Sequence, residues 1–135
     1  MRILAVDHGA ARAGLAISDP SGTIASPLTV IEPPDPVGVA SIAEDEGAEL
    51  VVVGLPVSLS GQEGEQAAEA RRFAAELERR LAVPVETYDE RLTTRMANQS
   101  ARAGATAPAD ALAAAHLLES YLQSRGQAAE ERSDG

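Results

Sequence analysis

The sequence predicts an α/β fold in which a mixed five-stranded sheet is flanked by helices on both faces. The first observation is the order of the expected elements: three strands come first, and helices and strands then alternate. The second is that residues 3–6 and 50–53 are apolar throughout, as in strands buried on both faces. Because a helix precedes each of the last two strands, right-handed crossovers place these strands parallel to the first.

The first three strands are expected to form an antiparallel meander. Residues 13–18 follow the first strand after a short Gly-Ala-Ala-Arg segment, which is close enough for a hairpin. Residues 19–22, Asp-Pro-Ser-Gly, indicate a turn because Pro presets one turn dihedral and Gly tolerates the other. A third strand is predicted over residues 23–31, with an interruption or bulge near Pro27.

The rest of the chain alternates between helical and extended patterns after a Pro-rich break. The expected elements are a short helix that stops near Gly47, a strand at 50–53, a helix from Gln62 that Pro84 ends, a strand at 85–89, and helices at 93–102 and 109–125. Residues 1–125 are therefore expected to form one domain, and residues 126–135 a flexible polar tail.

Length and composition fit a single packed domain. The chain has 135 residues, of which 44% are hydrophobic, enough for one core and too few residues for two ordinary domains. It has no cysteine, so neither disulfides nor thiolate zinc sites can stabilise it, and a reducing compartment fits. The first apolar run is too short for a signal peptide or a membrane span, so we expect a cytoplasmic protein.

The charge balance argues against a protein that coats nucleic acid through bulk electrostatics. Twenty-one acidic residues against 11 basic ones give a formal net charge of -10. All 11 basic residues are arginine, whose fork binds phosphate in a bidentate manner, so discrete phosphate contacts remain open. On charge alone, an acidic protein with no polyanionic partner is favoured, and the motifs must decide.

Three acids from distant segments are the candidate catalytic residues. Asp7 ends the first buried strand and Glu90 directly follows the last one, so both fall at the edge where such sheets bind ligands. Asp110 begins the final helix. Each also has a purely structural explanation, as a turn cap, a solvated acidic turn or a helix cap. Adjacent carboxylates in an extended chain point apart, so Asp89 or Glu90 can face Asp7, but not both.

Such a set of carboxylates fits two-metal phosphodiester cleavage, in which two ions stabilise the attacking and leaving oxygens. Without thiolates and with only two histidines, hard cations such as Mg²⁺ or Mn²⁺ are favoured over zinc. His116 is expected to have a core role, and the role of His8 stays open.

Further residues are candidates for phosphate contact. The loop at 54–64 precedes a long helix and offers backbone amides, although it lacks the Gly-Lys-Ser/Thr ending of a Walker A loop. The two arginines that flank the acidic motifs could bind phosphate or pair with the acids, and threonines after Glu90 could cap a helix. The candidate nucleic-acid or phosphate contacts are Gly9, Arg12, Gly54, Pro56, Ser58, Gly61, Arg91, Thr93 and Thr94.

Four ordered motifs resemble the YqgF family, also called RuvX. They are Asp7-His8-Gly9 through Arg12 and Gly14 to Ala16-Ile17-Ser18-Asp19; Val53-Gly54-Leu55-Pro56; Asp89-Glu90-Arg91-Leu92-Thr93-Thr94; and Asp110 through Ala113-Ala114 to Leu118-Glu119-Ser120-Tyr121-Leu122. The resemblance covers about residues 1–125. It implies a ribonuclease H-like fold related to the RuvC resolvase.

The resemblance also implies a function. Members are described as nucleases that mature pre-16S rRNA, with Holliday junction resolution as the alternative. Asp7, Glu90 and Asp110 would then be the catalytic metal ligands, with Glu90 chosen over Asp89 by this resemblance alone. The implied cofactor is Mg²⁺ or Mn²⁺, and the implied partners are pre-rRNA or branched DNA and a pre-ribosomal particle. The protein would act as a monomer or a homodimer, and a junction-cutting enzyme would need the paired sites of a dimer.

Two departures from the family pattern agree with the acidic charge. Ala11 stands where a lysine is common, and residues 104–109 lack the basic residues that often precede the final acid. Both argue against tight nucleic-acid binding but not against metal binding. A catalytically idle nucleic-acid-binding module is therefore a second hypothesis.

A third hypothesis takes Asp7-x-Gly9 as the phosphate loop of sugar kinases, actin and Hsp70, but those folds need two such domains. With aromatics at 2%, no stacking platform separates RNA from DNA as substrate.

Overall fold

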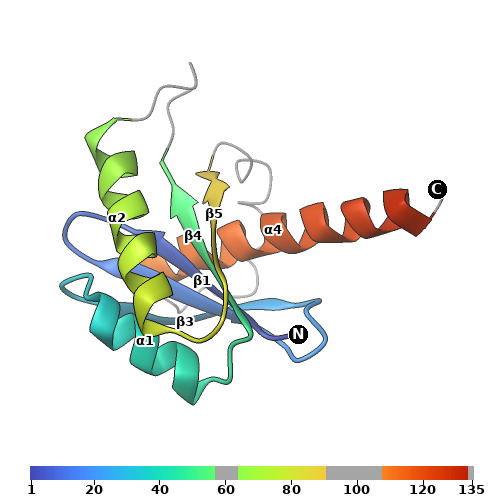
Figure 1. Cartoon of the computed structure of the whole chain (residues 1–135), viewed down its shortest axis with the longest axis horizontal. Helices are drawn as coiled ribbons and strands as arrows, with labels where there is room; N and C mark the ends of the chain where they lie inside the picture. The colour runs from blue at the N-terminus through green and yellow to red at the C-terminus, as the bar shows by residue number, and fades with distance from the viewer. Residues whose placement is uncertain (57–63, 91–107, 134–135) are drawn as a thin grey trace.

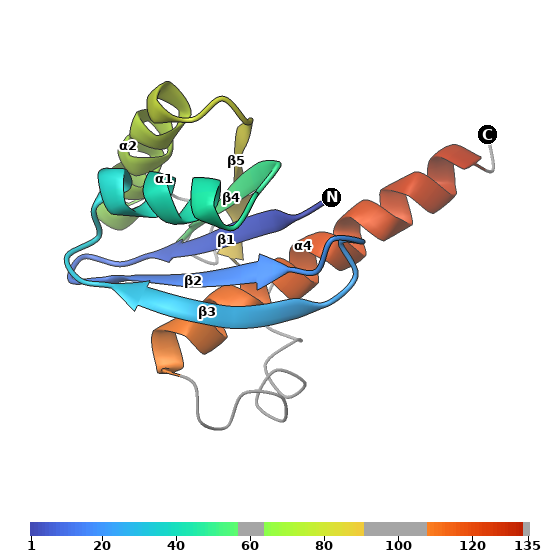
Figure 2. The ribbon, with the colours of Figure 1, turned by 90° about the horizontal axis from the view of Figure 1, so that it is seen from below.

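Five strands form one sheet in the order β3-β2-β1-β4-β5 (Figures 1 and 2). The computed structural model describes residues 1–56, 64–90 and 108–133. The strands are β1 (Ile3–His8), β2 (Ala13–Ser18), β3 (Ala25–Ile31), β4 (Leu50–Leu55) and β5 (Val85–Asp89). The first three are antiparallel neighbours, whereas β4 is parallel to β1 and β5 to β4. The predicted mixed five-stranded sheet is confirmed.

Helices cover both faces of the sheet, as the sequence predicts. Figure 2 shows α1 (Pro36–Asp45) and α2 (Glu65–Arg80) on one face and α4 (Ala109–Ser133) across the other. Among the described residues, no helix is both long enough and apolar enough to cross a lipid bilayer.

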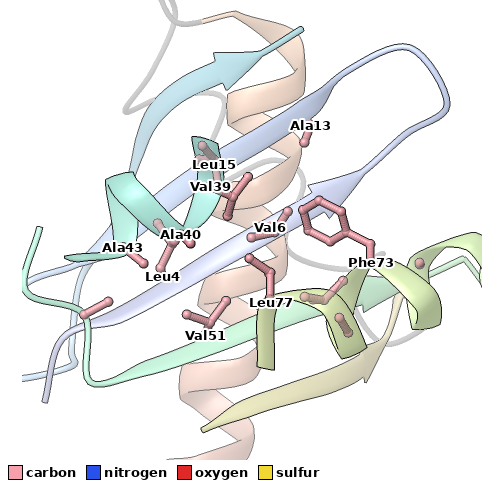
Figure 3. Packing of buried hydrophobic residues seen from close by; sticks show 14 of the residues in the cluster. Leu4, Val6, Ala13, Leu15, Val39, Ala40, Ala43, Val51, Phe73 and Leu77 are labelled. Atoms are coloured by element: carbon pink, nitrogen blue, oxygen red, sulfur yellow. The ribbon is translucent and has the colours of Figure 1, made fainter. Parts of the chain in front are cut away.

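Alternation along the strands divides the buried side chains between two cores. In β1, Leu4 and Val6 face α1 and α2, where they pack with Phe73 and Leu77 (Figure 3). Ile3 and Ala5 belong to the second core, between the sheet and α4. The face of α4 that covers the sheet includes the buried alanines at 111, 114 and 115, whose small side chains allow a close approach of helix to sheet.

The expected irregularity in the third strand is present. Leu15 pairs with Thr29 and the next residue, Ala16, pairs with Pro27, so Leu28 is an extra residue in β3. The strand begins at Ala25 rather than at residue 23, because the Asp19 carboxylate accepts hydrogen bonds from the amides of residues 23 and 24 and holds them in the preceding turn.

The last helix differs from the expectation. It continues to Ser133, past the predicted end at residue 125. A single glycine at 126 costs only about 1 kcal/mol in a helix interior, and the Gln-Ala-Ala-Glu-Glu-Arg segment after it consists of good helix formers. The flexibility of residues 126–135 stays a prediction, and the helix expected at 93–102 lies outside the described residues.

Candidate active site

The site is built on one row of residues across the α4 face of the sheet. Asp7 lies on this face because Ile3 and Ala5 do, four and two positions earlier in β1. On one side, the β1–β2 register pairs Asp7 with Gly14. On the other, Val6 pairs with Val53, so Gly54 is the neighbour of Asp7 in β4. Asp7 therefore has a glycine on either side.

Glu90 directly follows β5 and its side chain meets Asp7. Burial, together with the hydrogen bond to Asp7 and the charges of Asp7 and Asp89, raises the pKa of Glu90 to about 8. Glu90 therefore carries a proton at neutral pH and donates it in its hydrogen bond to Asp7. Asp89 pairs with Leu55, which faces α1 and α2, so Asp89 starts from the opposite face of the sheet. Of these two neighbouring acids, the structure brings Glu90 to Asp7.

Asp110 lies in the first turn of α4, above β2. Its backbone packs against Gly14, where a Cβ atom would lie 1.9 Å from the Asp110 carbonyl oxygen. Its carboxylate lies 3.5 Å from Nη1 of Arg12, whose Nε lies 3.8 Å from Glu32. Within residues 1–56, 64–90 and 108–133, no three acidic or histidine side chains are gathered as around a metal ion. Asp7 and Glu90 are in contact, and the backbone of Asp110 packs on Gly14, the residue that pairs with Asp7.

The donor chemistry nevertheless fits a hard divalent cation. Glu90 keeps its proton beside Asp7 because burial disfavours its ionised form, and because a second negative charge next to Asp7 would be repelled. A divalent cation would remove that repulsion, and carboxylate oxygens are the ligands that Mg²⁺ and Mn²⁺ prefer. The Asp110 carboxylate is half-exposed and its contact to Arg12 is long, so a rotamer change could bring it to an ion.

The structure describes four of the nine candidate phosphate contacts. The amide of Gly9 donates to the carbonyl oxygen of Arg12 at 2.9 Å and closes the β1–β2 turn. Arg12 is exposed at the edge of the site beside Asp110. Gly54 is buried in β4 with the Glu90 side chain against it, and Pro56 follows that strand. The other five, Ser58, Gly61, Arg91, Thr93 and Thr94, lie outside the described residues.

The two histidines differ in their surroundings. The His8 ring lies 4.7 Å from the Phe73 ring of α2, and burial lowers its pKa although Glu69 and Asp7 act in the opposite direction. His8 is thus a neutral, packed neighbour of Asp7. His116 is half-buried on α4, and its Nε2 atom has no hydrogen-bond partner in the described part of the chain.

Sequence reasoning did not assign a role to Gly14. The signal was present, because a hairpin with a four-residue connection at 9–12 places residue 14 opposite residue 7. The sequence alone does not show that α4, from the far end of the chain, packs against Gly14.

The shared proton predicts an unusual pH dependence of stability in the metal-free protein. The folded protein binds a proton at Glu90 up to pH about 8, whereas the unfolded chain releases it near 4.5, the ordinary value. Stability should therefore fall as the pH rises from 4.5 to 8. Glu90→Gln should remove this slope and raise the free energy of unfolding at pH 8 by about 1–2 kcal/mol, a figure reduced for solvent screening.

Urea denaturation in EDTA at pH 5 and pH 8 measures this effect. Glu78→Gln, at an exposed position on α2, is the control and should leave the slope unchanged. An equal slope in wild type and Glu90→Gln would show that Glu90 and Asp7 do not share a proton.

The fold and the acidic pair define a protein of the ribonuclease H-like class, with carboxylates at the ends of β1 and β5 and at the start of α4. Residues 1–124 match the RuvX family, described as Holliday junction resolvase, and the chain belongs to this family.

Curated relatives share most of their length with this chain. One from Chloroflexus aurantiacus (strain ATCC 29366 / DSM 635 / J-10-fl), named "Putative pre-16S rRNA nuclease", is 41% identical over 133 residues, which cover 91% of this chain and 87% of the relative. A protein of the same name from Thermobifida fusca is 51% identical over 106 residues, covering 76% and 67%. The predicted family is thereby confirmed.

Solved structures support the fold. RuvC of T. thermophilus in complex with a Holliday junction substrate superposes with a TM-score of 0.69 over 93% of this chain and 95% of that one, at 15% identity. The fowlpox virus Holliday junction resolvase gives a TM-score of 0.57 at 14% identity, covering 92% and 99%. At such identities the likeness shows the ribonuclease H-like fold alone.

Proposed function

We propose that this protein is a metal-dependent endonuclease of the cytoplasm that hydrolyses phosphodiester bonds and processes the 5′ end of pre-16S rRNA during ribosome biogenesis. The observation that carries the proposal is the contact of Asp7 with Glu90 on the α4 face of the sheet. Asp110 lies over β2, the strand next to Asp7. The names of the relatives support the rRNA precursor as substrate.

Asp7, Glu90 and Asp110 would hold Mg²⁺ or Mn²⁺. When bound, a pair of such ions activates water and stabilises the leaving oxygen. Asp7 and Glu90 supply carboxylate oxygens at the ends of two rigid strands, and Glu90 gives up the proton that it shares with Asp7. The neutral His8 ring, packed on Phe73, limits the space on the opposite side of β1.

Arg12 supplies the cationic group next to these acids. It is exposed, and its contacts to Glu32 and Asp110 are long, at 3.8 and 3.5 Å. Exposed pairs of this kind contribute about 0–1 kcal/mol, so the guanidinium can exchange them for a substrate phosphate. Discrete contacts of this type reconcile phosphate binding with a net charge of -10. They also agree with weak rather than tight binding of nucleic acid.

The second candidate is resolution of Holliday junctions in DNA, which the description of the matched family favours. Cutting two strands of a four-way junction requires two sites at a fixed separation, and therefore a homodimer. Processing of an rRNA end requires only one site, so a monomer suffices.

The test compares substrates under identical conditions. Wild type and Asp110→Asn are incubated with an rRNA precursor that contains the 16S 5′ end and with a synthetic four-way junction, each in Mn²⁺ and in EDTA. We expect product from the rRNA precursor in Mn²⁺ only, with a rate reduced about 100-fold or more in the variant, which corresponds to about 2.7 kcal/mol.

Each other outcome selects another hypothesis. Product from the junction alone would establish the resolvase, and pre-rRNA processing would be refuted. Binding of either substrate without cleavage in Mn²⁺ would identify a catalytically idle binding module.

A further inference from the structure

We propose that Gly14 and Gly54 are the positioning residues of the acidic site, because the missing side chains on either side of Asp7 are what allow Asp110 and Glu90 to approach it. The catalytic meaning of this inference rests on the proposed function. The geometric claim concerns the chain itself and can be tested without substrate.

Neither glycine is explained by the conformation of its backbone. Among the described glycines, only Gly22 and Gly47 have a positive φ. Gly14 and Gly54 lie inside β2 and β4, where a glycine weakens the strand by about 0.5–1 kcal/mol relative to alanine. Both are buried and both flank the same residue. Two glycines in one row across a sheet therefore require another explanation. We attribute them to the lack of room for a side chain at either position.

At Gly54 the space is occupied by a catalytic candidate. A Cβ atom there would lie 2.6 Å from Oε1 and 3.1 Å from Cγ of Glu90. It would also lie 3.0 Å from Cδ2 of Leu117, so that side chain would have to shift by a few tenths of an ångström. The Glu90 side chain thus lies directly over the position that a side chain would fill. An alanine would push the carboxyl group away from Asp7.

At Gly14 the space is occupied by backbone. A Cβ atom would lie 1.9 Å from the carbonyl oxygen of Asp110, 2.4 Å from its carbonyl carbon and 3.0 Å from the amide nitrogen of Ala111. No rotamer change relieves such a clash, so any side chain here would lift the first turn of α4. That movement would carry Asp110 away from the sheet.

The decisive experiment uses Gly54, because its clash is with a side chain that can be shortened. Mn²⁺ affinity is measured by electron paramagnetic resonance for wild type, Gly54→Ala, Glu90→Asp and the double variant. Gly38→Ala is the matched control, because a Cβ atom at this helical position meets only ordinary contacts of 3.7 Å or more. Gly54→Ala should weaken Mn²⁺ binding about 10- to 100-fold, the range seen when the support of a ligand is lost. Gly38→Ala should leave it unchanged.

The double variant separates positioning from general damage. Glu90→Asp removes one methylene and thereby makes room for the alanine methyl, so the double variant should bind Mn²⁺ no more weakly than Glu90→Asp alone. If the two losses multiply instead, Gly54 does not act through Glu90 and the inference is overturned. If Gly54→Ala does not fold, the double variant is expected to fold, and its failure to do so also overturns the inference.

A separate outcome concerns the proposed function. If wild type binds no Mn²⁺, the metal-dependent nuclease is refuted, and crystal structures of wild type and Gly54→Ala then decide the geometric claim. A Glu90 carboxyl group displaced from Asp7 in the variant supports it. An unchanged position contradicts it.

Discussion

Asp7→Asn is expected to reduce Mn²⁺-dependent cleavage at least about a thousandfold, equivalent to about 4 kcal/mol of transition-state stabilisation. Asp7 is the central residue of the site, since Glu90 contacts it and Gly14 pairs with it. The amide has the shape of the carboxylate but lacks its charge, so it binds a divalent cation weakly. It also no longer repels an ionised Glu90. The variant should therefore fold at least as stably as wild type at pH 8.

Single-turnover cleavage and urea denaturation of the same samples measure both effects. Asp35→Asn is the control, because Asp35 caps α1 by accepting a hydrogen bond from Val37, and asparagine caps equally well. It should retain wild-type cleavage. Substantial cleavage by Asp7→Asn, with the Asp35 control unaffected, would exclude Asp7 from the reaction.

Gly14→Ala is expected to lower the free energy of unfolding by about 3 kcal/mol or more, at the upper end of what overpacking costs. The added methyl group would overlap the backbone of Asp110, and neither β2 nor α4 can move alone, because these two elements pack extensively against each other. The effect is large because backbone, unlike a side chain, has no alternative rotamer. Urea denaturation measures the loss.

Gly38→Ala serves as the reference here too, since alanine in a helix should stabilise α1 by a few tenths of a kcal/mol to about 1 kcal/mol. A Gly14→Ala protein as stable as wild type would mean that α4 does not lie on Gly14 in solution.

The fold could be predicted from the sequence because its signals are local. Apolar runs identify the buried strands, Pro27 marks the bulge, and the alternation of helices and strands gives the parallel pairs. The predicted end of the last helix, at residue 125, was wrong because the glycine at 126 was taken to stop the helix, although good helix formers follow it. The predicted start of β3, at residue 23, was wrong because hydrogen bonds to the Asp19 side chain extend the preceding turn.

The site could be predicted only in part. Alternation along a strand shows that Asp89 and Glu90 point apart, but which of them reaches Asp7 depends on how β5 sits against β4. The sequence predicts a phosphate contact for Gly54, and this stays a prediction; that Glu90, from a different strand end, lies against Gly54 is visible only in the structure. Which acid reaches Asp7 and which residue lies against Gly54 both depend on distances between elements. A local sequence pattern does not give those distances.

The pairing of β1 with β2 has a consequence for how the chain can vary. Side chains alternate between the two faces of a strand, so a slip of one residue in this hairpin would exchange Asp7 with Val6. The acid would enter the hydrophobic core beneath α1 and α2, and a valine would take its place on the α4 face. The connection at residues 9–12 should therefore tolerate replacement of its exposed side chains but neither an insertion nor a deletion of a single residue.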